Sequence, residues 1–117
     1  MTTTSPHTEP LSKQTVSLGT LAKGTRLIVG TSRGECCLVV LCPKENLVMV
    51  WGYDPRLTGI IARLDRSIYG GGRKRAFRRG CVSYNMQMEL IFKNHTLLCP
   101  PTTSLRVEGD DWFYDVF

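Results

Sequence analysis

The chain has few of the residues from which enzyme and metal sites are usually built. It contains only two histidines, His7 and His95, and its five cysteines include no CxxC pair. No Ser/His/Asp set, HExxH motif or glycine-rich phosphate loop after a strand can be found. We therefore expect a protein that is not an enzyme and that holds no metal ion or other cofactor.

The sequence also lacks an apolar segment that would direct it into or across a membrane. No apolar run reaches the roughly 20 residues that a membrane-spanning helix needs. The first residues, Met1–Ser5, are polar and do not resemble a signal peptide. Together with an odd number of cysteines, this favours reduced thiols that serve as small core residues. We expect a nuclear or cytoplasmic protein that is not secreted and has no membrane partner.

Positive charge is concentrated in one stretch of the chain. The sequence has 15 Lys and Arg against 10 Asp and Glu, and eight of these basic residues fall between Asp54 and Gly80 with only two acids. Within this stretch, Arg73–Arg79 holds five cations, one Phe and no acid, and glycines lie on both sides of it. Cations packed this closely repel one another unless a polyanion neutralises them. The natural polyanion is a phosphate backbone, so the composition predicts contact with nucleic acid.

We expect this loop and its neighbouring arginines to bind single-stranded or structured RNA or DNA. Arg and Lys would hold phosphates, while rings next to them in sequence would stack on unpaired bases. Arginine-rich segments that fold on RNA have a similar composition. The predicted nucleic-acid site comprises Arg73, Lys74, Arg75, Phe77, Arg78, Arg79, Arg63 and Arg66.

A second hypothesis is a non-enzymatic protein-interaction or self-assembly module, of the kind found among small viral accessory proteins. The basic loop would then be a nuclear import signal, and the acidic, aromatic residues 108–117 would dock on a partner or on a second copy. A homo-oligomer would form through this segment or through a sheet edge. The predicted docking residues are Asp111, Trp112, Phe113, Tyr114 and Phe117. Packing of these rings on the chain's own fold is the other interpretation, because they are costly to leave in water.

Short apolar runs separated by turn residues predict strands early in the folded part. Arg26–Val29, Glu35–Cys42 and Leu47–Trp51 are rich in β-branched residues, with Ser32–Gly34 and Pro43–Asn46 as turns between them. These runs predict a three-stranded antiparallel meander. The second run is nearly all apolar, which predicts that both of its faces are covered.

The next segment has the features of a helix start. Asp54 and Pro55 are typical of the N-cap and the first helical position, and Gly70 suits a helix C-terminus. Apolar residues follow at offsets that share one helical face, namely Leu57, Ile60, Ile61, Leu64 and Ile68. The pattern predicts a helix over about 55–69, with a strand over Leu57–Leu64 as the alternative.

Regular alternation follows the basic loop. Apolar residues occupy every second position of Val82–Phe92, which predicts one long antiparallel strand with a buried and a wet face. Leu97–Cys99 and Leu105–Val107 predict a final strand pair or one bent strand. Pro100 and Pro101 interrupt it, because proline is excluded from the middle of a central strand.

These elements predict a mostly β fold with one helix, built as a small antiparallel barrel of five to seven strands. The order of strands and helix is similar to that of an OB-type barrel, in which a helix lies between the third and fourth strands. A β-sandwich or another α+β sheet is the alternative. We expect one β-rich domain over 15–107 with a basic loop at 70–80, preceded by a disordered polar tail at 1–14 and followed by the acidic, aromatic tail 108–117.

Overall fold

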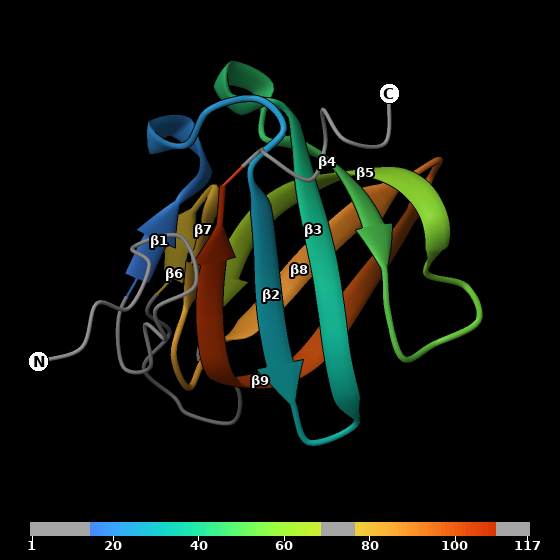
Figure 1. The fold of residues 1–117 in the computed structure, drawn as a ribbon. Helices are drawn as coiled ribbons and strands as arrows, with labels where there is room; N and C mark the ends of the chain where they lie inside the picture. Colours follow the sequence, from blue (N-terminus) through green and yellow to red (C-terminus); the bar gives the residue numbers. More distant parts are fainter. Residues whose placement is uncertain (1–14, 69–76, 110–117) are drawn as a thin grey trace, which may run out of the picture.

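The computed structural model describes residues 15–68 and 77–109, with only the backbone described for Phe77 and Arg78. The predicted tail at 1–14, most of the predicted basic loop and nearly all of the acidic, aromatic tail therefore lie outside the described residues. The predicted mostly β, antiparallel character is confirmed (Figure 1). No helix in the described part of the chain is long and apolar enough to cross a membrane.

Nine strands and two single-turn 3₁₀ helices make up the described ranges. In chain order they are β1 (Thr15–Ser17), η1 (Leu18–Thr20), β2 (Arg26–Thr31), β3 (Gly34–Cys42), η2 (Pro43–Glu45), β4 (Leu47–Trp51), β5 (Thr58–Ile68), β6 (Phe77–Arg79), β7 (Cys81–Ser83), β8 (Gln87–Phe92) and β9 (His95–Glu108).

Six of these strands form an antiparallel ring. Their order is β4-β3-β2-β9-β8-β5, and β5 pairs back to β4 and so completes the ring. β6 adds to β5, and β1 pairs with β7 in a separate two-stranded sheet. Because β5 stands where the helix was expected, the similarity to an OB-type barrel does not hold.

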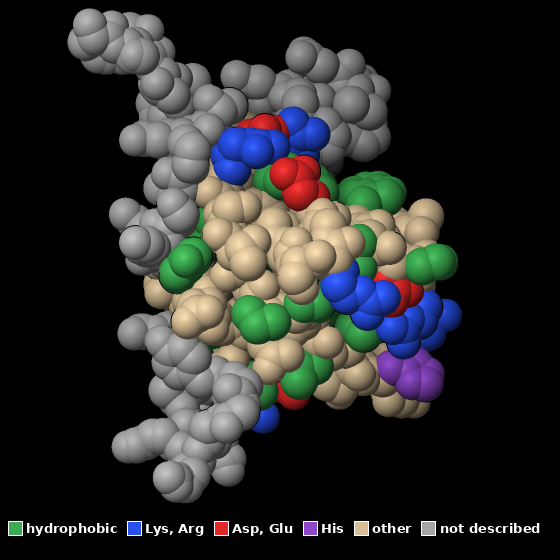
Figure 2. All heavy atoms as spheres, turned by 90° about the horizontal axis from the view of Figure 1, so that it is seen from below, with side chains coloured by type: hydrophobic (Ala, Val, Ile, Leu, Met, Phe, Trp, Pro, Cys, Tyr) green, Lys and Arg blue, Asp and Glu red, His purple; other side chains and the backbone are tan. Residues whose placement is uncertain are grey.

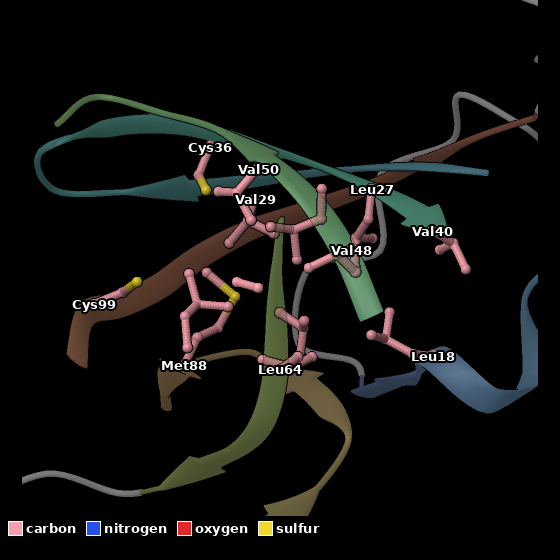
Figure 3. Packing of buried hydrophobic residues seen from close by; sticks show 14 of the residues in the cluster. Leu18, Leu27, Val29, Cys36, Val40, Val48, Val50, Leu64, Met88 and Cys99 are labelled. Carbon is pink, nitrogen blue, oxygen red and sulfur yellow. The ribbon is translucent and has the colours of Figure 1, made fainter. Parts of the chain in front are cut away.

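The hydrophobic core lies inside the ring and follows from strand alternation. The inward residues of β2, β3 and β4 are fully buried, including Leu27, Leu38 and Val50. In Figure 3, Leu18 from η1 lies at one end of the cluster and Cys99 from β9 at the other. The predicted meander is confirmed, with β2 paired to β3 and β3 to β4.

The cysteines behave largely as predicted core residues. Cys36 and Cys99 are buried, whereas the other three are half-buried, and all five are free. Burial raises the pKa of the Cys36 thiol to about 12. This thiol therefore stays protonated at neutral pH and packs as a small apolar group.

The predicted helix over 55–69 is wrong, and the alternative of a strand is right. Asp54 and Pro55 begin a tight turn, in which the Leu57 amide donates to the Asp54 carbonyl over 2.7 Å. The Asp54 side chain accepts from the Arg56 amide over 2.9 Å. An Asp that caps a helix and an Asp that caps a turn use the same side-chain bond to a backbone amide, so the sequence does not distinguish them.

The apparent helical spacing arises from both faces of β5. Leu64 points inward and is fully buried, whereas Ile61 points outward and is 57% exposed. A register shift at Asp65 then changes which residues face inward, so that Ser67 is buried and Arg66 is not. Apolar residues on two faces, separated by a bulge, imitate a period of 3.6.

The long strand predicted over Val82–Phe92 is divided in two, and its predicted inward register is correct from Met86 onward. Asn85 has a φ of 68°, which ends β7 and turns the chain into β8. Met86, Met88 and Leu90 are all buried as expected. Just before the turn the prediction is wrong, because Ser83, expected on the wet face, is buried and Tyr84 is only half-buried.

The prolines bend β9 without ending it. The part of β9 before them pairs with β8, and the part from Thr102 onward pairs with β2. Figure 1 shows this strand bending at the bottom of the view, where it passes from β8 to β2. Proline is tolerated here because the strand changes partners at this point, so a missing amide donor costs little.

We predict that Leu64→Ala destabilises the protein far more than Ile61→Ala. The first substitution leaves a cavity in the core and should cost about 2–5 kcal/mol, whereas Ile61 is largely exposed and should cost less than about 1 kcal/mol. Urea denaturation measures both. On a helix the two residues would share one face, so equal losses would contradict the strand.

We predict that Asp54 stabilises the fold above acidic pH. Hydrogen bonds from the Arg56 side chain lower the pKa of Asp54 to about 2, so its contribution is complete above the unfolded-state pKa of about 4 and disappears as the pH falls toward 2. The difference in Tm between the parent and Asp54→Ala should therefore be largest at neutral pH and shrink between pH 4 and pH 2. The same difference at pH 7 and at pH 2.5 would contradict this assignment.

Candidate nucleic-acid interface

The arginine-rich segment connects two paired strands. β6 pairs antiparallel with the end of β5, with Arg66 opposite Arg79 and Ile68 opposite Phe77. Residues 69–76, which join Ile68 to Phe77, lie outside the described residues. The described ends therefore define a β-hairpin whose connection carries the cations Arg73, Lys74 and Arg75.

The base of this hairpin is held by backbone hydrogen bonds. The Gly80 amide donates to the Asp65 carbonyl over 3.0 Å, and the Gly80 carbonyl accepts from the Leu18 amide over 3.0 Å. Gly80 has a φ of 62°, and a Cβ at this position would lie 2.7 Å from the Asn46 amide nitrogen. Glycine adopts this left-handed conformation without strain and leaves room for the Asn46 side chain, so it suits the turn that leads from β6 into β7. The turn that follows the hairpin is thus fixed to β5 and to η1.

Two arginines and two carboxylates balance one another at the hairpin base. Arg66 and Arg79 stand directly opposite each other, an arrangement that is unfavourable for like charges. The Arg66 Nε donates to Glu89 Oε1 over 2.7 Å, and the Arg79 Nη1 lies 3.4 Å from Asp65 Oδ1. On the face shown in Figure 2, blue basic side chains likewise lie beside red acidic ones.

Beyond the base, the sequence offers no acid to balance the charge. No Asp or Glu occurs from Arg66 to Met88. Arg73, Lys74 and Arg75 of the connection and Arg78 of β6 thus lie in an acid-free stretch of the sequence, next to a hairpin base whose charges are balanced. The positive charge that no nearby acid in the sequence balances is therefore carried by the connection and by β6.

The predicted site residues fall into three groups. Arg79 is exposed, with 65% of its side chain accessible, whereas Arg66 is about a third exposed and held by Glu89. Arg63 is exposed on β5 and, together with Lys93 and apolar neighbours, lines a separate shallow hollow of about 480 Å³. The remaining residues lie outside the described part, or are described in the backbone alone. Arg73, Lys74 and Arg75 lie outside the described residues, and Phe77 and Arg78 are described in the backbone alone. The predicted docking residues of segment 110–117 also lie outside the described part of the chain.

The rings of Trp51 and Tyr53 do not gather with these arginines. Trp51 is opposite Thr58, which precedes Arg66 by eight residues of β5, or roughly 26 Å at 3.3 Å per residue. Tyr53 packs against the core, and burial raises its pKa. Its ring instead meets the Arg33 guanidinium, 5.6 Å from the ring centroid. Stacking at the hairpin would thus depend on Tyr69 and Phe77, whose side chains are not described.

Sequence reasoning missed the two carboxylates at the hairpin base. Glu89 lies on the wet register of the predicted strand, which was a usable signal, but its pairing with Arg66 depends on how β8 and β5 align. Asp65 could not be found, because it lies in the bulge of a strand predicted as a helix. Among the described residues, no group of three or more His, Cys, Asp or Glu could hold a metal ion.

The hairpin and its charge distribution are not shared with a recognisable relative. A scan against protein-family models and searches of curated proteins and of solved structures found no match to this chain. Function can therefore be inferred only from its residues and their geometry.

Proposed function

We propose that the protein binds single-stranded or structured nucleic acid with the β5–β6 hairpin. The observation that carries this proposal is the pairing of Ile68 with Phe77. This pairing means that an acid-free, arginine-rich segment connects two paired strands. At the base of these strands, arginines and carboxylates balance one another. The phosphate backbone is the ligand whose charge this segment complements.

The residue types of the hairpin suit nucleic acid in chemistry as well as in charge. Arginine-rich segments that order on binding recognise structured RNA. Arg residues supply planar forks of donors that match phosphate oxygens and guanine edges. Seven of the eight residues in the proposed site are Arg or Lys, and the eighth, Phe77, offers a ring for stacking.

Each part of the hairpin would have a separate role. Arg73, Lys74, Arg75 and Arg78 would contact phosphates or bases. Arg79 is exposed but forms an ion pair with Asp65, so it would contribute less to nucleic-acid affinity. Arg66 is held by Glu89 and would position the base of the hairpin. Arg63, which lines the separate hollow, would at most extend the contact along β5.

We predict that replacing Arg73, Lys74 and Arg75 by Ala abolishes most nucleic-acid affinity. Removing one phosphate contact lowers the slope of log K against log[salt] by about 0.7–0.9, so the slope should fall by roughly two units. Fluorescence anisotropy with labelled single- and double-stranded RNA and DNA across a salt series measures both quantities. Changing Lys23, Lys44 and Lys93 to Ala is the matched control, because these residues are exposed and their replacement removes the same charge.

Equal affinities of the hairpin variant and the parent would show that the hairpin is not the site. A parent without salt-sensitive binding would favour the protein-interaction hypothesis, with the basic loop as an import signal.

We predict that Phe77→Ala weakens binding with little change in the salt slope. Stacking contributes roughly 1–3 kcal/mol per base and releases no counterions. The same anisotropy titrations test this variant. A slope that falls as much as in the triple variant would argue against a stacking role.

A further inference from the structure

The ring has an apolar surface on its outside as well as inside. The outward residues of β2, β3, β4 and β5 include six apolar side chains, which we call the outer apolar face. They are Ile28, Cys37, Val39, Met49, Trp51 and Ile61. Residues directly opposite each other on paired strands share one face. Ile28, Cys37 and Trp51 accordingly form one row across the sheet, and Val39, Met49 and Ile61 form a second.

This surface is exposed over β4 and β5. The described residues include three exposed large hydrophobic side chains, and two of them, Trp51 at 41% and Ile61 at 57%, lie on the outer apolar face. On the neighbouring β3, Val39 is opposite Met49 and only 2% exposed. A shallow hollow of about 280 Å³ lies over Val39 and is lined also by Arg26, Cys37 and Trp51. A contiguous apolar surface of this kind marks a site of contact.

Four cations line hollows in or beside this surface. The hollow over Val39 is lined by Arg26, and two further hollows beside Ile61 are lined by Arg56, Arg63 and Lys93. Glu45 is the one acid that lines any of these three hollows. Arg26 and Arg56 are paired with Glu108 and Asp54, and Glu35 also lies on the outward register of β3. The surroundings therefore favour an apolar occupant whose carboxylates meet Arg63 and Lys93 beside Ile61.

The chain supplies such an occupant at the edge of this surface. The second row continues from Val39 to Arg26 and on to Glu108 of β9, and the Arg26 guanidinium donates to the Glu108 carboxylate. Figure 1 shows β9, β2, β3 and β4 side by side. The chain thus reaches Gly109, where the described residues end, at the border of the outer apolar face.

The eight residues after Gly109 have the required chemistry and length. Segment 110–117 contains Trp112, Phe113, Tyr114, Val116 and Phe117, together with three Asp and no cation. Eight extended residues span about 26 Å. The path from β9 across β2, β3 and β4 to β5 takes four strand spacings, or about 19 Å.

We propose that the outer apolar face binds segment 110–117 of the same chain, across the strands from Arg26 toward Ile61. The rings of the segment cover Val39, Met49 and Trp51, while its carboxylates meet the cations beside Ile61. This contact is separate from the nucleic-acid hairpin and does not depend on it.

The test uses the fluorescence of Trp112 in the full-length chain. The protein has two tryptophans, so Trp51→Phe leaves Trp112 as the only one and keeps a ring on the face. We expect the emission of Trp112 to be blue-shifted and shielded from acrylamide relative to a synthetic peptide of residues 108–117. Adding Ile61→Asp should shift the emission back toward that of the peptide.

Leu98→Asp is the matched control in the same background. Leu98 is the third exposed large hydrophobic residue, at 45%, and it lies on β9 opposite Glu89 of β8, away from the outer apolar face. Both variants change an exposed residue, so both should fold, as far-ultraviolet circular dichroism can verify. The Leu98 variant should keep the blue-shifted emission.

Three outcomes would overturn the proposal. Emission like that of the free peptide in the Trp51→Phe protein would show that the segment does not dock. Emission unaffected by Ile61→Asp would place it elsewhere. A blue shift that depends on protein concentration, with a dimer mass in light scattering, would mean that the face binds a second copy instead.

Discussion

The pairing of β5 with two neighbours is the constraint on which the rest of the structure depends. β5 contacts β4 through its first half and β8 through its second, and these two pairings complete the ring. Without β5, the inward residues of β4 and β8 would face water and the sheet would have two open edges. The buried Ala62 and Leu64 of β5 fill the same core as the inward residues of β2, β3 and β4.

The same strand also creates the candidate site. The bulge at Asp65 changes the alternation of β5, which brings Ser67 inward and allows its hydroxyl to donate to the Cys81 carbonyl over 2.7 Å. Asp65 itself then faces the arginines at the hairpin base. A local irregularity in a strand thus fixes where the basic hairpin begins and neutralises its base, a common use of bulges.

The outer surface of the ring divides its charge and apolar area between two regions. Positive charge without nearby acids is concentrated in the sequence that joins β5 to β6, whereas apolar side chains gather over β2, β3 and β4. Arg66 at the hairpin base lies eight positions after Thr58, which is opposite Trp51. This separation permits two different contacts on one small chain, one with a polyanion and one with an acidic, aromatic peptide.

Much of the fold was determined by the sequence alone. The apolar runs of β2, β3 and β4 and the turns between them predicted the meander, because β-branched residues and turn chemistry act locally. The inward register of Met86, Met88 and Leu90 followed from alternation with a period of two. The nearly continuous apolar run of β3 predicted cover on both faces; inward Leu38 and outward Val39 are both buried, whereas outward Cys37 is only half-buried.

Other features were decided only by the tertiary structure. Asp54 and Pro55 begin a turn and not a helix, because β5 gains the ladders of β4 and β8 that an isolated segment cannot form. The pairing of Arg66 with Glu89 requires residues 23 positions apart to meet. The outer apolar face exists only where four strands align their outward residues in rows. Local propensity cannot specify such long-range registers, since they arise from closing the ring as a whole.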